Sequence, residues 1–218
     1  MNQEACCYAC ELQVAVTEET EPFFLFYSTA SVIWHELLHH YRAFIFPEDR
    51  KNFPPQAFQP VYCSWYAVHA ALTNEFLDAN AELAKEFGFG TFIVDDGWCF
   101  DEMKRVTPEA LINWYQDIGC WTVSENKLPS FKKHVAYAQS LGLRYLLWTS
   151  PFFLGARSPE LQAVKAIPEA ISREEGVSHS IIDPAYTPLA ESTQAKLIRL
   201  VSDLGLDGLK VDFLDYIP

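Results

Sequence analysis

A lysine and an aspartate interrupt an apolar stretch near the end of the chain, GLDGLKVDFLD at residues 205–215. Side chains alternate along a β-strand, so Lys210 and Asp212 are expected to share one face of this strand with Leu214. The opposite face would carry the residues suited to packing against helices, which are Leu209, Val211 and Phe213. Burial of a lone ion is very costly, whereas two opposite ions side by side are tolerated if other groups also bond them.

This pair of ions has a chemical interpretation and a structural one. Lys210 would stabilise the ionised form of Asp212 and lower its pKa, which is the condition that a nucleophilic carboxylate needs. Alternatively, the two residues form an ion pair that only closes the end of a strand. The spacing by itself leaves both interpretations open.

Acidic and aromatic residues also follow three other stretches that read as strands, VYCSWY at 61–66, TFIVDD at 91–96 and LRYLLWT at 143–149. These residues are Trp65, Tyr66, Asp95, Asp96, Trp98 and Trp148, and Asp215 follows the last strand. The carboxyl ends of parallel strands meet at one edge of a sheet, and active sites gather there. We therefore expect these side chains to line one rim.

The Asp95–Asp96 pair has two further interpretations. It could cap a helix after the strand, or it could bind Mg²⁺ in a phosphoryl-transfer site with Asp212 as the third ligand. Lys210 next to Asp212 weighs against a dense cation cage. The sequence contains no GxGxxG after a strand and no GxxxxGK[ST], so dinucleotide-binding and P-loop functions lack support.

Helical patterns separate the four predicted strands. A helix begins after Thr73 and ends at Gly88, and others are expected over about 130–141, from Ser158 onward and over about 188–204. Four alternations of strand and helix predict parallel strands with right-handed crossovers. Two α/β architectures fit this pattern, a doubly wound open sheet and the first part of a (β/α)8 barrel.

The first 60 residues have a different character. Residues 12–30 hold two β-like runs, and Ser31 precedes a helical pattern of apolar residues. Four prolines at 47–60 indicate a connector. Cys7 and Cys10 form a lone CxxC without a second pair at zinc-finger spacing, so reduced thiols are favoured over a metal site.

Composition narrows the range of functions. The formal net charge of −13 argues against binding to nucleic acid or to an anionic membrane. The N-terminus lacks the basic and apolar regions of a secretory signal, and no run approaches the roughly 20 apolar residues of a membrane span. With six cysteines expected to be reduced, we predict a cytoplasmic protein.

Six stretches, in order and at the predicted strand ends and loops, resemble the α-galactosidases of glycoside hydrolase family 36, in the melibiase group. The resemblance runs from about Tyr27 to the end of the chain. The stretches are PVYCSWY (60–66), IVDDGW (93–98), the W-x-V…K-x-P-x-F-K-x-H-V region (121–135), LGLRYLLWTSPFFLG (141–155), IIDP (181–184) and GLDGLKVDFLD (205–215).

This resemblance implies a fold and a reaction. Residues 1–46 would be the end of a β-sandwich plus a joining helix, 47–60 a linker, and 61–218 strands 1–4 of a (β/α)8 TIM barrel. Asp212 would be the nucleophile of a retaining hydrolase that forms a covalent galactosyl-enzyme. Lys210 would bond sugar hydroxyls and set the charge state of Asp212.

The resemblance also implies how the sugar is held. Asp95 and Asp96 would accept hydrogen bonds from hydroxyls of the terminal galactose. Trp65, Tyr66 and Trp121 would shape the pocket and stack on the sugar, and Trp148 would pack nearby. Substrates would be α-galactosides of the melibiose or raffinose type, no cofactor or metal is implied, and the full-length enzyme could form a homo-oligomer.

Several departures from the family pattern bear on these expectations. Cys120 stands before Trp121 where the family usually has an acid, Ala185 replaces an arginine after Asp183-Pro184, and Cys99 replaces a common glutamine. The family's general acid/base, another aspartate beyond the fourth strand, is absent from this chain. We therefore expect a fragment of an enzyme, with a non-catalytic sugar-binding or degenerate remnant as the alternative.

Overall fold

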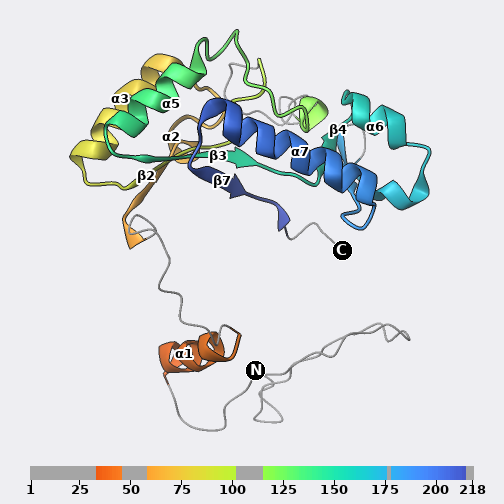
Figure 1. The fold of residues 1–218 in the computed structure, drawn as a ribbon, viewed down its shortest axis with the longest axis horizontal. Coiled ribbons are helices and arrows are strands. Elements are labelled where there is room, and N and C mark those ends of the chain that lie inside the picture. Colours follow the sequence, from red (N-terminus) through yellow and green to blue (C-terminus); the bar gives the residue numbers. More distant parts are fainter. Residues whose placement is uncertain (1–32, 46–57, 102–114, 176–177, 215–218) are drawn as a thin grey trace, which may run out of the picture. The chain divides into compact units, whose positions relative to one another are not determined.

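The computed structural model describes residues 33–45, 58–101, 115–175 and 178–214 (Figure 1). The chain divides into two compact units, Met1–Asn52 and Phe53–Pro218. The predicted β-runs at 12–30, the CxxC motif and most of the predicted connector lie outside the described residues. In the described part of the chain, no helix has both the length and the apolar character needed to cross a membrane.

The first unit contributes one described helix, α1 (Trp34–Ile45), which confirms the helical pattern in this segment. Its first turn holds the acidic Glu36 and its last turn holds Arg42, the arrangement that suits the helix dipole. Its apolar side chains Trp34, Leu38 and Phe44 are exposed.

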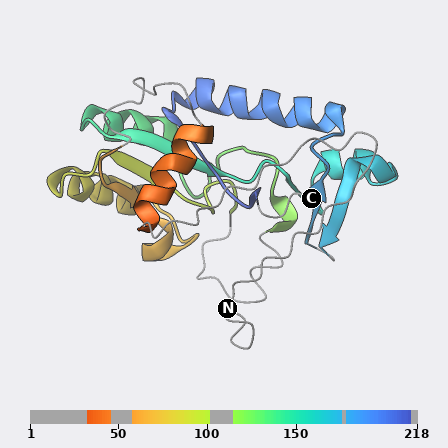
Figure 2. The same ribbon diagram turned by 90° about the horizontal axis from the view of Figure 1, so that it is seen from below.

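The second unit is built on a four-stranded parallel sheet, flanked by three longer helices (Figures 1 and 2). The strand order is β1-β2-β3-β7. The strands are β1 (Val61–Cys63), β2 (Thr91–Val94), β3 (Arg144–Thr149) and β7 (Gly208–Val211), and the helices are α3 (Asn74–Glu86), α5 (Phe131–Ser140) and α7 (Thr187–Leu204).

The order of the strands in space follows their order in the chain, which confirms the predicted alternation and parallel pairing. Along the same series, α3 packs on α5 and α5 contacts α7. A doubly wound sheet requires a point at which the strand order reverses, and the described strands have none. The sheet therefore extends in one direction, strand by strand.

Helix boundaries follow the predicted signals. Thr73 caps α3, because its Oγ1 accepts a hydrogen bond of 3.1 Å from the backbone N–H of Phe76. Ser158 caps the short helix α6 (Pro159–Val164) in the same way. At the end of α7, Gly205 adopts φ 71°, the left-handed conformation in which glycine terminates helices.

The core lies between the sheet and the helices. Phe92 and Tyr145, on neighbouring strands, are fully buried, as are Leu77 of α3 and Val135 of α5. Complete burial of side chains of this size stabilises a fold by about 1.5–3 kcal/mol each. This layer fixes the strands, and so the positions of the residues at their carboxyl ends.

A second, antiparallel sheet was not predicted. It has the order β4-β6-β5 and lies beyond the carboxyl ends of the parallel strands (Figures 1 and 2). Its strands are β4 (Phe153–Gly155), β5 (Ile171–Glu175) and β6 (His179–Ile182), and the remaining short elements are α2 (Trp65–Val68), η2 (Tyr115–Asp117) and η3 (Pro168–Ala170).

Two predicted strands are shorter than expected. β1 ends at Cys63, and the next residues turn into α2, so Trp65 and Tyr66 do not continue the strand. β7 ends at Val211, and Phe213 has a φ of 58°, which breaks the alternation of faces. The prediction that Phe213 shares the face of Leu209 is therefore wrong.

Candidate active site

Lys210 lies between two carboxylates at the carboxyl edge of the parallel sheet. Its Nζ is 2.7 Å from Asp95 Oδ2 and 3.1 Å from Asp212 Oδ2. Burial by itself would lower the pKa of Lys210, but the two anions outweigh burial and raise it. The structure thus confirms the pairing of Lys210 with Asp212 and adds Asp95 as the closer partner.

Asp212 follows β7 directly and is held by four groups. Oδ2 accepts the indole N–H of Trp148 at 2.9 Å as well as the Lys210 ammonium, and Oδ1 accepts the backbone N–H of Phe213 at 3.0 Å. Its own backbone N–H donates to the carbonyl of Thr149. The side chain keeps 37% exposure, so a substrate can reach it.

These contacts keep Asp212 ionised. Burial by itself would raise the pKa of Asp212, but the hydrogen bonds from Trp148 and from the Phe213 backbone outweigh burial, together with Lys210. The pKa of this carboxyl is therefore held below its ordinary value. The predicted effect of Lys210 has the right sign, and the indole of Trp148 and the backbone N–H of Phe213 act in the same direction.

Asp95 is buried and fully engaged. Its Oδ1 accepts the backbone N–H of Asp96 at 2.9 Å, and its Oδ2 accepts Lys210 and the thiol of Cys63, whose Sγ is 3.1 Å away. Its backbone N–H donates to Ser64 Oγ at 2.9 Å. Sequence reasoning missed Cys63, although its place before Ser64-Trp65 in a matching stretch put it at a strand end.

Asp96 is also buried, and it organises the turn after β2. Its Oδ1 accepts the backbone N–H of Gly97 at 2.7 Å. Gly97 has a φ of 104°, and a Cβ there would lie 2.6 Å from the Ala70 backbone. The buried Lys127 donates to the carbonyls of both Gly97 and Ala70, at 2.6 and 3.0 Å. Lys127 was not predicted as part of this region.

Three tryptophans line the same region. Trp98 Nε1 donates to the backbone carbonyl of Trp148 at 2.9 Å, and the rings of Trp98 and Trp121 stack with centroids 6.2 Å apart. The ring of Trp121 lies 6.1 Å from that of Trp148. All three are buried. The structure thus places Trp148 against Asp212 and Trp121 against Trp148, and the predicted roles of the two rings in sugar binding remain predictions.

Trp65 and Tyr66 are placed differently. Both lie on α2, where Trp65 is half-buried with its ring edge-on to His69 at 4.7 Å. Tyr66 is 87% exposed. The predicted stacking of these two rings on a sugar remains a prediction.

The geometry is unsuited to the alternative of a magnesium site. That interpretation needs Asp95, Asp96 and Asp212 to share one cation, but the Lys210 ammonium lies between Asp95 and Asp212. Across the residues that the structure describes, no group of three histidine, cysteine or acidic side chains is arranged to hold a metal ion.

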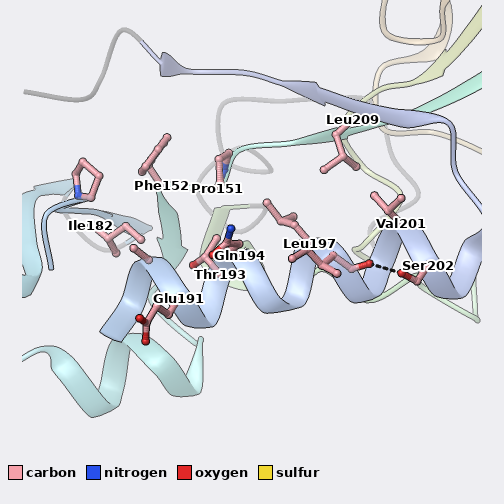
Figure 3. A pocket seen from close by; sticks show the side chains of 13 residues that line it. Pro151, Phe152, Ile182, Glu191, Thr193, Gln194, Leu197, Val201, Ser202 and Leu209 are labelled. Carbon is pink, nitrogen blue, oxygen red and sulfur yellow. Dashed lines mark hydrogen bonds between the residues drawn. The ribbon is translucent and has the colours of Figure 1, made fainter. Parts of the chain in front are cut away.

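An apolar groove of about 580 Å³ lies elsewhere, along α7 and on the side of β7 opposite to Lys210 (Figure 3). Leu197 and Val201 of α7 point toward Leu209 of β7 across it, and Pro151 and Phe152 line the same side as Leu209, between it and Ile182. Such a lining offers little to a sugar hydroxyl. The carboxylates at the edge of the sheet therefore suit a sugar better than this groove does.

Comparison with known proteins identifies relatives of one kind. No protein-family model matches the chain. It is similar to the α-galactosidase of Escherichia coli, with 27% identity over 129 residues, and to the α-galactosidase Mel36A of Lactobacillus acidophilus, with 26% identity over 110 residues. These matches cover 58% and 50% of this chain but 16% and 14% of those proteins, so the chain spans about a sixth of their length.

Solved structures agree in fold. The α-galactosidase TtGalA from Thermus thermophilus, in complex with p-nitrophenyl α-D-galactopyranoside, is 25% identical, with a TM-score of 0.55 over 72% of this chain and 31% of that chain. The family 36 α-galactosidase AgaA from Geobacillus stearothermophilus, in a complex with raffinose, is 20% identical, with a TM-score of 0.58 over 71% of this chain and 21% of that chain. At 20% identity the likeness concerns the fold alone.

The resemblance to family 36 α-galactosidases that the motifs predicted is thus confirmed. The chain is thus similar in sequence to part of these α-galactosidases, and its mixed α/β fold with a parallel sheet matches their fold.

Proposed function

We propose that this chain carries part of the galactose-binding site of a retaining α-galactosidase, with Asp212 as the nucleophile. The observation that carries the proposal is the state of Asp212: an accessible carboxylate, kept ionised by an indole and an ammonium at the carboxyl edge of a parallel sheet. A nucleophile in a retaining glycosidase has to be an anion next to the anomeric carbon.

The reaction follows from this arrangement. An oxygen of Asp212 attacks the anomeric carbon of a terminal α-galactosyl group, the bond to the leaving oxygen breaks, and a galactosyl ester of Asp212 forms. Water then hydrolyses that ester with retention of configuration. Asp95, Asp96 and Lys210 bind the sugar hydroxyls, and the buried Trp148, packed against Trp121, holds Asp212 in place.

The leaving oxygen needs a proton from a second carboxyl group about 5–5.5 Å from the nucleophile. We place this general acid/base in a part of the enzyme beyond these 218 residues. The relatives are about six times longer than the matched segment, which supports this placement.

The shape of the sheet supports the same conclusion. Among the described strands, β7 pairs only with β3, and Val211 at its end is 44% exposed. Parallel sheets are normally covered on both faces, and an exposed edge strand is a template for pairing with a further strand. We propose that the four strands are the first half of a (β/α)8 barrel, that the next strand pairs with β7, and that the next helix fills the groove along α7 (Figure 3).

Covalent trapping tests the proposal. A 2-fluorogalactosyl donor with an activated leaving group needs little help from an acid, and it should leave a fluorogalactosyl mass on the peptide that contains Asp212. Asp212→Asn should stay unlabelled, whereas Glu191→Gln, on α7 beside the groove, should be labelled like the wild type. Labelling that persists in Asp212→Asn would refute the assignment of the nucleophile.

A second candidate function is sugar binding without chemistry. The observation that favours it is that hydrogen bonds already hold Asp95 and Lys210 in place. Groups fixed in this way can hold a sugar without an acid/base. Saturable binding of galactose in calorimetry, with no trapping at Asp212, would select this function over the glycosidase.

A further inference from the structure

Cys63 is the last residue of β1, and neither the motifs nor the mechanism above uses its side chain. Its Sγ lies 3.1 Å from Asp95 Oδ2. The next residue, Ser64, is fully buried and accepts the backbone N–H of Asp95 at 2.9 Å. Consecutive residues at the end of β1 therefore hold both the carboxylate and the main chain of Asp95.

The oxygen that accepts the thiol is also the oxygen that holds Lys210. Asp95 Oδ2 is 2.7 Å from Lys210 Nζ, and the same ammonium reaches Asp212 Oδ2 at 3.1 Å. A chain of hydrogen bonds thus runs from Cys63 on β1, through Asp95 and Lys210, to the carboxylate after β7. The orientation of Asp95 decides where the ammonium lies.

The thiol keeps its proton at neutral pH. Burial raises the pKa of Cys63 to about 11, and the neighbouring Asp95 adds to the increase, although a backbone hydrogen bond from Trp65 opposes it. A protonated thiol donates to Oδ2, whereas a thiolate would repel it.

We propose that Cys63 is a positioning residue of this site: its S–H fixes the Asp95 carboxylate so that Oδ2 holds the Lys210 ammonium against Asp212. The importance of this contact for galactose binding rests on the proposed function. The hydrogen bond itself does not, and one arm of the test needs no sugar.

The sugar-free arm measures the alkylation of Cys63 by iodoacetamide, followed by mass spectrometry of its peptide between pH 7.5 and 9.5. In the wild type the rate should rise about tenfold per pH unit throughout, because only the thiolate reacts. Asp95→Asn removes the anion at constant volume and should speed alkylation of Cys63 about threefold or more, which corresponds to half a pKa unit. The exposed Cys120 is the internal control and should be unaffected. An unchanged Cys63 rate in Asp95→Asn would overturn the proposal.

The second arm compares Cys63→Val, which has a similar volume and no donor, with Cys63→Ser, which keeps a donor. In Cys63→Val, the dissociation constant for galactose should rise about fivefold or more, which is the effect of losing one hydrogen bond. The NMR titration of the Asp212 carboxyl should also shift. Cys63→Ser should stay closer to the wild type in both. A purely structural role would lower the stability of either variant and leave the Asp212 titration in place, which would overturn the proposal.

The two arms separate the possible failures. If the wild type binds no galactose, the proposed function fails, and the alkylation arm still decides whether Cys63 holds Asp95. If Cys63→Val does not fold, the alkylation arm alone decides. Galactose binding that is identical in the wild type and a folded Cys63→Val overturns the positioning role and leaves the proposed function intact.

Discussion

Replacing Trp148 by phenylalanine should raise the pKa of Asp212. Trp148 donates its indole N–H to Asp212 Oδ2 at 2.9 Å, and phenylalanine keeps an aromatic ring but cannot donate. Among the individual hydrogen bonds that favour the ionised form of Asp212, this one has the largest effect. The substitution therefore removes one of the main contributions that offset the burial of the carboxylate.

The size of the effect follows from the exposure of the carboxylate. Hydrogen bonds to charged groups contribute about 1.5–3 kcal/mol when solvent is excluded. The Asp212 side chain is 37% exposed, so water replaces part of the lost bond, and about 1 kcal/mol remains. That corresponds to a rise of about 0.7 in the pKa of Asp212.

The assay is a titration of the aspartate carboxyl carbons by ¹³C NMR, with the Asp212 signal assigned from its loss in Asp212→Asn. Trp98→Phe is the matched control, because Trp98 is equally buried and donates its indole N–H to the backbone of Trp148 and not to a carboxylate. Both variants should lose stability, but only Trp148→Phe should move the Asp212 titration. Equal Asp212 titrations in the wild type and Trp148→Phe would refute the assignment of the indole as the principal donor.

Three further predictions concern charge, pH and backbone. Lys210→Met should raise the pKa of Asp212 in the same NMR titration. It should also weaken galactose binding, measured by calorimetry, about tenfold, which corresponds to the loss of one charged hydrogen bond. Unchanged binding would contradict the proposed role of Lys210 in holding the sugar. Burial lowers the pKa of His134 in the folded state. The stability that depends on neutral His134 is therefore complete above the unfolded pKa of about 6.5, and it is lost as the pH falls through the folded pKa. The urea midpoints of unfolding at pH 7.5 and pH 5 should differ less in His134→Gln than in the wild type. Gly97→Ala should lower the free energy of unfolding, measured in denaturant, by more than about 2 kcal/mol. Gly88→Ala should lower it by only about 1 kcal/mol, because a Cβ at Gly88 would meet open space. Equal losses in the two variants would show that the turn at Gly97 relaxes.

The pH prediction for His134 has a geometric basis. Its Nδ1 is 2.6 Å from Asp78, which partly opposes the effect of burial on the pKa of His134. Its Nε2 is buried without a hydrogen-bond partner in the described part of the chain. Protonation would place a donor there with nothing to accept it, which is costly in a low-dielectric environment.

Sequence periodicity predicted the elements that bury one face. Leu77 and Ala81 of α3 and Phe92 of β2 are buried as their spacing required, and the caps at Thr73 and Gly205 follow simple chemistry. The antiparallel sheet β4-β6-β5 escaped prediction although its strands, of three to five residues, are similar in length to β1, β2 and β7. The sequence of β5 is ISREE, which is mostly polar and lacks the apolar run that marked the parallel strands.

The candidate site was predictable in its residues but not in its contacts. Composition at the strand ends and the resemblance both pointed to Asp95, Lys210 and Asp212, and the structure brings the three together. Which partner each group takes depends on side-chain orientation, and no sequence pattern encodes it. Cys63 illustrates this, since a thiol at a strand end is ordinary until a carboxylate from the next strand lies 3.1 Å away.

The indole of Trp148 illustrates how strand register sets the chemistry. In the parallel pairing of β3 with β7, Trp148 lies opposite Lys210, and Thr149 lies opposite Val211. Residues opposite each other across a pair point to the same face, so Trp148 and Lys210 share a face, and Asp212, directly after β7, contacts both of them. A slip of one residue would turn Lys210 toward α7 and would separate the ammonium from both anions. The register in which Leu147 lies opposite Leu209 therefore places Trp148 and Lys210, two of the groups that keep Asp212 ionised.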